Sequence, residues 1–538
     1  METSFAIGPK TESLRKGFMS PFSVILTNKS DQDAFLVDFS IENIPRCENC
    51  KGYFSSLCNV QENYWECPLC GQLNQSEPLE SKERFGSYEV ILPTTFGLDI
   101  FVLCISLDFH ADDIEIMKPH IIKLIQKIDR RVVICIPNID GKIGMICPHI
   151  PHYYSNGGRI MESDQDFSMY PDYSNIPLPI AAFSRPDQID LARYVIHPSQ
   201  LKNAALSVNS FQSCVCDGVF PISQLILRFV STLQLSPLHF TCILPSSSQI
   251  ALFDRKIVTD SIFRVDWLCV SISESIISTT KNLNGLIYSF NKHTLFGILD
   301  QIASQQYSYN CYINSRTGGC SSEWKPLLCP MSFADENLIY VPTSSNSQPF
   351  VLDLHPYGNS DDISIQLTTK TIEFREKQYR EILKIKNQKI SVSNDINAVV
   401  NSINVPSLIW LWLIRTLEKP KRDVIAAIIR AAVTFLQNLP KDSQNYKFLL
   451  HSVCSLSHLD IYNSNVYLRL YQVYYLCLNS PSKISLVPAQ IESVYVFLSQ
   501  VYSDNNNDQA SIHRSPVPDW IKKPEENTLA FINELLEE

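Results

Sequence analysis

Four cysteines near the N-terminus constrain this chain more than any other feature. Cys47-x2-Cys50 is followed, after sixteen residues, by Cys67-x2-Cys70. Each Cys-x2-Cys turn directs two thiolates at one ion, and two such turns complete a tetrahedral shell of four sulfurs. Because the protein fills all four positions, water has no place on the metal. We therefore predict a structural zinc ribbon over residues 45–76, with Cys47, Cys50, Cys67 and Cys70 as its ligands.

The same cysteines could in principle be unrelated thiols or a redox pair. Four unrelated buried thiols are improbable when two paired turns stand at a separation that zinc sites use. Redox chemistry at one Cys-x-x-Cys requires a βαβ context, which the ribbon lacks. Cys58 is a fifth cysteine in this region; its neighbours Leu57 and Val60 indicate core packing, although it could replace a ligand. The predicted ligand set does not include it.

The length and the remaining cysteines indicate a multidomain protein from a reducing compartment. A chain of 538 residues exceeds what one hydrophobic core supports, and 45% hydrophobic with 19% charged residues is typical of globular proteins. Of its 17 cysteines, many, such as Cys104, Cys135 and Cys269, stand inside Val/Ile/Leu runs. Such residues pack as reduced, small hydrophobes, so we expect a cytosolic protein.

Charge and hydropathy exclude two classes of function. The formal net charge is −10, and duplex nucleic acid requires clustered Lys and Arg, so we expect no nucleic-acid partner. Met1–Lys10 contains no apolar leader, and the densest apolar run, Leu408–Ile414, is far shorter than the roughly 20 residues of a membrane span. We expect membrane contact to be peripheral.

The hydrophobic pattern of the first half predicts an α/β unit. Ile100–Ile105 is a buried strand, Ile114–Ile128 has apolar residues at helical spacing, and Arg131–Ile136 is a second buried strand. This order predicts a βαβ unit and a parallel sheet. The same pattern of strands and helices recurs later, with strands expected at Phe240–Leu244 and Arg264–Val270 and a helix at His293–Ser304.

Outside this unit the pattern is first β and then α. Residues 21–41 and 338–390 are rich in strand patterns, and Ser87–Leu92 is a further expected strand. From about Asp395 we expect helices, at Leu408–Leu417, Val424–Leu436, Tyr446–Ser455, Val466–Leu478 and Ile491–Tyr502. Trp410 and Trp412 lie in a stretch that is apolar nearly all round, which predicts a buried helix. The fold class is thus multidomain, with α/β, β and α parts.

The flanks of the cysteines carry a family resemblance. Around them stand Arg46, Tyr53, Trp65 two residues before the third ligand, and Asn74 after the fourth. This segment resembles the zinc finger of the two inner-coat subunits of COPII vesicles. Ser56-Leu57-Cys58 followed by Val60 resembles the GTPase-activating subunit more than the cargo-adaptor subunit. Weaker similarity continues in order along the chain, at Phe5–Pro9, Pro21–Thr27, Gly86–Ile91, Phe101–Asp108 and Val265–Ser271.

The resemblance implies a domain order. The expected parts are a β-sandwich formed by residues 1–44 and 306–394, the zinc ribbon at 45–76, a von Willebrand A-like trunk at 87–305, a helical domain at 395–504 and a vestigial gelsolin-like module at 505–538. Only Arg514–Ile521 resembles the entry to that last module, and the motif that carries the family's catalytic arginine finger is not seen. We do not transfer that role to Arg514.

The resemblance also implies a function. It is that of a vesicle coat subunit in transport from the endoplasmic reticulum to the Golgi, on the cytosolic face of the membrane. The implied partners are a Sar-type small GTPase, a cargo-adaptor subunit and outer-coat proteins. We expect no enzyme activity of its own and at most activation of the GTPase. The alternatives are a non-activating paralogue that competes for the same partners and, more weakly, a zinc-ribbon protein associated with nucleic acid.

Two further motifs are interpreted as structural. Ser106–His110 lacks the Asp-x-Ser-x-Ser loop with which a von Willebrand A fold binds metal. Of Asp108, Asp112 and Asp113, two are expected to cap the following helix, so the trunk is predicted to hold no metal. Arg316-Thr-Gly-Gly319 lacks the spacing of a phosphate-binding loop and is interpreted as a hairpin turn.

Overall fold

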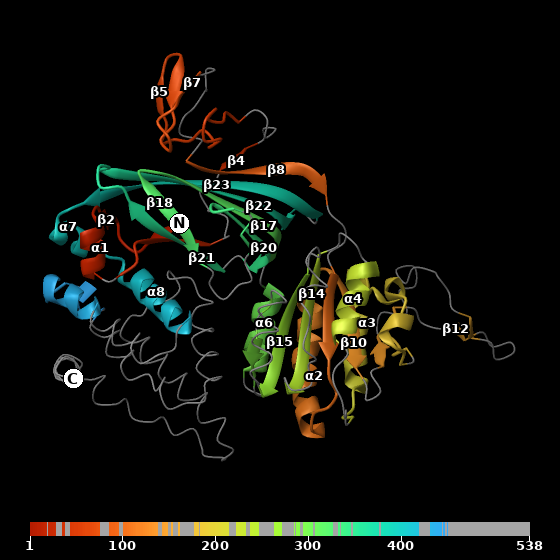
Figure 1. The fold of residues 1–538 in the computed structure, drawn as a ribbon. Helices are drawn as coiled ribbons and strands as arrows, with labels where there is room; N and C mark the ends of the chain where they lie inside the picture. Colours follow the sequence, from red (N-terminus) through yellow and green to blue (C-terminus); the bar gives the residue numbers. More distant parts are fainter. Residues whose placement is uncertain are drawn as a thin grey trace.

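A computed structural model gives the architecture of much of the chain (Figure 1). It describes residues 1–18, 20–27, 35–37, 44–75, 86–95, 100–137, 142–148, 152–153, 160–161, 177–181, 183–214, 222–232, 237–246, 263–271, 285, 287–290, 294–304, 307–325, 332–333, 335–345, 348–375, 378–418, 431–443, 445–446 and 449. The predicted helices at Tyr446–Ser455, Val466–Leu478 and Ile491–Tyr502, and the predicted module at 505–538, lie wholly or almost wholly outside these residues.

Residues 100–304 contain an α/β unit built on a six-stranded sheet. Its strand order is β11-β10-β9-β14-β15-β16, and all neighbours are parallel except β10 and β11. The strands are β9 (Ile100–Ile105), β10 (Arg131–Pro137), β11 (Ile143–Met145), β14 (Leu238–Ser246), β15 (Phe263–Ser271) and β16 (Ile287–Ser289). β9 and β10 are adjacent and parallel, with α2 (Ala111–Lys127) between them in sequence, which confirms the predicted βαβ unit.

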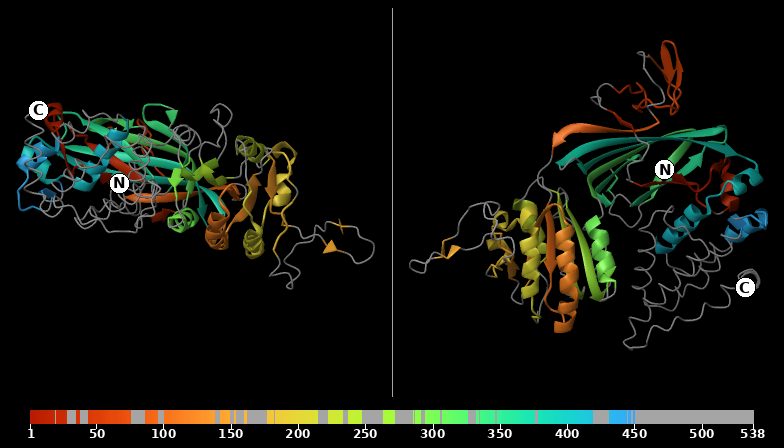
Figure 2. Two further views of the ribbon diagram at one scale, coloured as in Figure 1. Left: turned by 90° about the horizontal axis from the view of Figure 1, so that it is seen from below. Right: turned by 180° about the vertical axis from the view of Figure 1, so that it is seen from behind.

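Helices cover both faces of this sheet (Figure 2). α2, α3 (Leu201–Ser207) and α6 (Leu295–Ser304) bury their apolar side chains against one face. α4 (Ile222–Thr232) packs on the other face with the 3-10 turns near Ile189 and Leu191. Because every central strand is covered twice, its residues are continuously apolar, as in Ile100–Ile105, all of which are buried.

The remaining strands form two sheets that share one core. The small sheet has the order β1-β3-β21-β18, and the large sheet β19-β20-β17-β22-β23-β8-β4, with β2 also paired to β23. Their bounds are β1 (Glu2–Thr3), β2 (Ile7–Pro9), β3 (Ser23–Thr27), β4 (Phe35–Val37), β8 (Ser87–Thr95), β17 (Tyr307–Gly318), β18 (Cys320–Lys325), β19 (Ser332–Phe333), β20 (Leu338–Ser345), β21 (Pro349–Pro356), β22 (Asp362–Arg375) and β23 (Gln378–Ser393). N-terminal strands therefore pair with strands from beyond residue 306.

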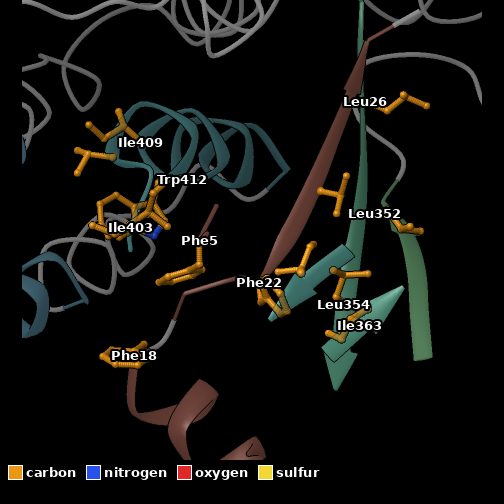
Figure 3. Close-up of a cluster of buried hydrophobic side chains, with 14 of the residues drawn as sticks. Phe5, Phe18, Phe22, Leu26, Leu352, Leu354, Ile363, Ile403, Ile409 and Trp412 are labelled. Atoms are coloured by element: carbon orange, nitrogen blue, oxygen red, sulfur yellow. The ribbon is translucent and has the colours of Figure 1, made fainter. Parts of the chain in front are cut away.

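The core between these sheets also receives helices from both ends of the described chain (Figure 3). Phe5, Phe18 from α1 (Glu12–Phe18), and Phe22 meet Leu352 and the other aliphatic side chains of β21 and β22. α7 (Ile396–Asn401) and α8 (Val405–Glu418) close one side of this core. Trp410 and Trp412 are buried in α8, as predicted. Residues 431–438 are helical, which covers the end of the expected helix at Val424–Leu436.

Two predictions about the sheets differ from the structure. The predicted trunk includes Ser87–Thr95, but β8 pairs with β23 and β4 and so lies in the large sheet. The predicted hairpin turn at Arg316–Gly319 is wrong, because β17 and β18 do not pair with each other. Instead Gly319, with a φ of +81°, passes the chain from the large sheet to the small one.

Candidate metal centre

The first cysteine turn of the ribbon is closed by two backbone hydrogen bonds. The Cys47 amide donates to the Gly52 carbonyl at 2.8 Å, and the Lys51 amide donates to the Cys47 carbonyl at 3.0 Å. This closure requires a left-handed residue, which is Lys51, with a φ of 58°. Gly52, the next residue, does not have a positive φ. Its absent side chain leaves room for Leu69, whose Cδ1 would lie 2.7 Å from a Cβ.

The second turn repeats the same geometry. The Cys67 amide donates to the Gln72 carbonyl at 2.9 Å, and the Gly71 amide donates to the Cys67 carbonyl at 2.8 Å. Gly71 has a φ of 73°, which makes it the equivalent of Lys51. Two equivalent turns therefore face each other, and each directs two sulfurs into the space between them.

The four predicted ligands come together at that point. Their sulfur atoms all lie within 4.8 Å of one another, with 3.5 Å between Cys47 and Cys70 and 3.6 Å between Cys50 and Cys67. A tetrahedral shell with Zn–S bonds of about 2.3 Å requires sulfur atoms about 3.8 Å apart. The residues therefore fit a structural zinc ion, and all four ligand positions belong to the protein.

The thiols of the cluster oppose one another's ionisation. The contact between the Cys50 and Cys67 sulfurs lowers the pKa of Cys50 to about 5. The same contact raises the pKa of Cys67 well above its usual range. A thiolate at one sulfur therefore opposes ionisation of its neighbour. Zinc ligation requires all of them as thiolates, and a dication supplies the charge that allows these to coexist.

A small antiparallel sheet supports the two turns. β5 (Asn59–Gln61), β6 (Tyr64–Glu66) and β7 (Leu73–Gln75) pair in that order. Trp65 on β6 is 1% exposed and packs edge-on against Phe54, with ring centroids 5.3 Å apart. This aromatic pair is the hydrophobic centre of a ribbon that is too small for a core of its own.

The other residues that carried the resemblance also hold the ribbon together. The Arg46 guanidinium lies 4.2 Å from the centre of the Tyr53 ring and also donates to the Tyr53 hydroxyl. The Asn74 side chain accepts from the Glu48 amide at 2.9 Å and so fixes the loop inside the first turn. Each of these side chains therefore shapes the loops that present the sulfurs.

Cys58 is not a ligand. It is fully buried in the core beneath the ribbon, and its sulfur accepts from the Ser55 amide at 3.3 Å. Among the residues that the structure describes, the one group of clustered metal-binding side chains is Cys47, Cys50, Cys67 and Cys70. The packing interpretation of Cys58 agrees with this placement.

The ribbon rests on the large sheet through a seat that the sequence does not reveal. We use the name ribbon seat for Arg316 and Gly318 on β17 and Gln366 on β22. Arg316 donates from Nε to the Cys50 carbonyl at 3.1 Å. Gln366 donates to the Tyr53 carbonyl at 2.8 Å and accepts from the Tyr53 amide at 2.6 Å. The sheet thus holds the backbone of the first turn directly.

Gly318 completes the ribbon seat by its lack of a side chain. A Cβ there would lie 2.5 Å from the Pro68 carbonyl oxygen and 2.7 Å from that of Leu69. Pro68 and Leu69 lie inside the second cysteine turn. Both turns therefore contact the segment whose sequence resembles a simple hairpin turn.

The acidic residues of the α/β unit take a different place from the predicted one. The N-cap of α2 is His110 and makes no side-chain cap hydrogen bond, while Asp112 and Asp113 lie in the first turn. They therefore act on the helix dipole and not as caps. Within the described residues, no metal-binding group contains Asp108, Asp112 or Asp113.

Comparison with known proteins identifies the ribbon. Residues 44–78 match the family model described as the Sec23/Sec24 zinc finger. "Protein transport protein SEC23 D" of Arabidopsis thaliana is 24% identical over 119 residues, which cover 19% of this chain and 16% of that protein. The Sec23/Sec24 zinc finger and the fit of its four sulfurs together establish zinc as a structural cofactor.

Solved structures extend the likeness to the fold. The crystal structure of the human COPII-coat protein Sec24c matches with a TM-score of 0.67 at 12% identity, covering 92% of this chain and 75% of that one. A von Willebrand factor type A protein from Catenulispora acidiphila matches with a TM-score of 0.37 at 10% identity, covering 67% and 79%. At that score the second likeness carries no argument, whereas the first shows a shared multidomain fold.

The described residues contain no helix both long and apolar enough to cross a membrane.

Proposed function

We propose that this protein is a COPII-type vesicle coat subunit in transport from the endoplasmic reticulum to the Golgi. The observation that carries the proposal is a Sec23/Sec24 zinc finger seated on a chain whose fold follows Sec24c over 92% of its length. The ribbon is bound to the large sheet through named contacts, so it is part of this scaffold and not an appended module.

The proposed partners are a Sar-type small GTPase in its GTP state, a cargo-adaptor coat subunit and outer-coat proteins. The protein would act from the cytosol as a peripheral component at the endoplasmic reticulum. Recruitment to an anionic membrane through a charged partner falls as salt rises, because exposed charges are screened. We assign no chemistry to the zinc, since the protein fills its coordination shell.

Flotation with liposomes tests this proposal. Purified protein should float with anionic liposomes that carry the GTPase bound to a non-hydrolysable GTP analogue. It should remain at the bottom of the gradient when the GTPase holds GDP. Pull-down of a cargo-adaptor subunit should succeed with the same preparation. The proposal fails if neither nucleotide-dependent flotation nor adaptor binding is seen.

GTP hydrolysis, measured on the same liposomes with GTP in place of the analogue, separates an activator from a regulator. An arginine finger typically accelerates hydrolysis by roughly 10³- to 10⁵-fold. Stimulation of that size would make the protein a GTPase activator, as in the activating subunit that its finger resembles. Binding without stimulation would make it a non-activating paralogue that regulates coat assembly by competing for partners.

A further inference from the structure

Four polar side chains are buried together far from the ribbon. They are His239 on β14, Arg264 and Asp266 on β15, and Tyr307, the first residue of β17. His239 and Asp266 have no exposed surface, Arg264 is 1% exposed and Tyr307 is 5% exposed. Burying an Arg and an Asp is expensive unless both are paired, so a cluster of this kind requires an explanation.

Asp266 is the centre of this cluster. Its carboxylate accepts from His239 Nε2 at 2.8 Å, from Arg264 Nε at 3.0 Å and from the Tyr307 hydroxyl at 3.2 Å. Arg264 Nη2 also lies 2.9 Å from Asp266 Oδ1, which makes the two residues an ion pair. The Arg264 guanidinium lies 4.4 Å from the centre of the Tyr307 ring. The His239 ring meets the same tyrosine at 4.5 Å. Tyr307 therefore contacts all three of the other members.

The charges in the cluster are balanced. Burial lowers the pKa of His239 to about 4, so this residue is neutral at pH 7. Burial alone would raise the pKa of Asp266, but Arg264 and His239 lower it below its usual range, so Asp266 is ionised. One anion and one cation remain, and the two neutral rings enclose them.

The members come from two parts of the fold. His239, Arg264 and Asp266 lie at the beginning of parallel strands of the α/β unit, whereas Tyr307 begins a strand of the large sheet. β15 of the α/β unit also contacts β20 of the large sheet. Figure 1 shows this end of the α/β sheet turned toward the large sheet. The hydrogen bond from Tyr307 to Asp266 therefore crosses the junction between the two parts.

We propose that these four residues form a joint that fixes the orientation of the α/β unit against the large sheet, with Tyr307 as its positioning residue. A buried ion pair is weak evidence for stability, because desolvation opposes the Coulomb attraction. The Arg264–Asp266 pair lies within β15, so the contacts that depend on orientation are those of Tyr307. Its hydrogen bond to Asp266 and its ring contact with Arg264 are directional and are lost in geometries that move the ring away. An apolar contact alone would tolerate sliding, and this network does not.

Matched substitutions on β17 test the joint. Tyr307→Phe removes the hydroxyl that donates to Asp266, and Tyr307→Leu also removes the ring beneath Arg264. Tyr309→Phe and Tyr309→Leu are the controls, because Tyr309 is buried on the same strand and packs on Tyr379, with ring centroids 5.8 Å apart. Thermal unfolding of the full chain first establishes that all four variants fold.

The distance between the two parts is the decisive measurement. Spin labels on genetically encoded side chains at Lys202, exposed on α3, and at Tyr357, 53% exposed beside β21, report the α/β unit and the two-sheet part. Both Tyr307 variants should broaden or shift the distance distribution, and Tyr307→Leu more than Tyr307→Phe. Hydrogen exchange at the start of β17 should become roughly 10-fold faster in Tyr307→Phe.

Two results would overturn the joint. One is a distance distribution in Tyr307→Leu that equals the parent protein's. The other is an equal broadening in the Tyr309 variants, which would assign the effect to general packing of β17.

Discussion

Cysteines gather in two regions of the molecule, the ribbon and the central strands of the α/β unit. In the α/β unit, Cys104 on β9 stands in register with Cys135 on β10 and Cys242 on β14, and Cys269 lies on the next strand. All four are fully buried. Burial raises the pKa of Cys135, Cys242 and Cys269 well above the usual range, so these thiols stay protonated.

The difference between the two regions lies in the backbone and not in the residue type. Cysteine turns with a left-handed residue direct two sulfurs to one point, and two such turns make a shell around an ion. Parallel strands instead place cysteines in a row beneath covering helices. A thiol there behaves as a small hydrophobe. Four cysteines therefore mean zinc in one place and core packing in the other.

Loss of zinc should have the largest effect on stability, and it should unfold the ribbon and leave the α/β unit folded. In Cys67→Ser we expect zinc content to fall from one ion per chain to none, with unfolding of the ribbon. Structural zinc contributes on the order of 10 kcal/mol to zinc-finger peptides. Native mass spectrometry measures the metal, and hydrogen exchange locates the unfolding.

Cys58→Ala is the matched control for this substitution. It removes a cysteine from the same region, and it should keep the zinc. Loss of metal from Cys58→Ala, or its retention in Cys67→Ser, would contradict the assignment of the four ligands.

Acid should weaken the α/β unit through His239. The unfolded state binds a proton at an ordinary pKa near 6.5, whereas burial lowers the folded pKa to about 4. Stability is therefore lost as pH falls from about 6.5 to 4, by roughly 3 kcal/mol. Urea unfolding at several pH values measures the slope. His239→Gln should show a smaller loss over this range than the parent protein, and an equal loss would contradict the assignment.

Cys242→Ser should sharpen the contrast between the two groups of cysteines. The hydroxyl would be buried among apolar side chains, and leaving it without a partner costs about 2 kcal/mol. Zinc content should stay at one ion per chain, and Cys242→Ala, which buries no hydroxyl, serves as the comparison. A serine variant that lost zinc would mean that the two groups are not independent.

Arg316→Ala should produce the smallest effect, because it leaves all four ligands in place. It removes the hydrogen bond to the Cys50 carbonyl, worth about 1.5 kcal/mol for a charged donor. We expect roughly 10-fold faster transfer of zinc to a coloured chelator. Lys389→Ala is the control, since Lys389 lies on β23 of the same sheet, is 54% exposed and pairs with Asp362. Equal rates of zinc transfer in the two variants would show that Arg316 does not help to hold the ribbon.

Local patterns in the sequence predict local structure well. Ile100–Ile105 is the strand that its apolar run predicts, and the four ligands follow from their spacing alone. These signals are contained within a few turns or strands of chain. The buried helix around Trp410 and Trp412 is visible for the same reason.

Contacts between distant segments are beyond such patterns. Gln366 and Tyr53 are 313 residues apart in sequence, and nothing near Gln366 indicates a partner. β8 has an ordinary strand pattern, which does not say which sheet it joins. The segment from Arg316 to Gly318 has the sequence of a glycine-rich turn. A Gly that makes room for a neighbouring backbone cannot be told, in a sequence, from a Gly that forms a turn. Lys51 likewise gives no sign of its left-handed conformation.

The pairing of β3 with β21 has a consequence for synthesis on the ribosome. Ser23 and Asp353, whose side chains hydrogen-bond across these strands, are 330 residues apart. At 5–20 residues per second, the N-terminal strands must wait on the order of half a minute for their partners. The whole α/β unit is made within that interval and can fold while β3 still has an open edge. A nascent chain of this design therefore needs protection of its first strands, by a chaperone or by the ribosome surface, until its later ones emerge.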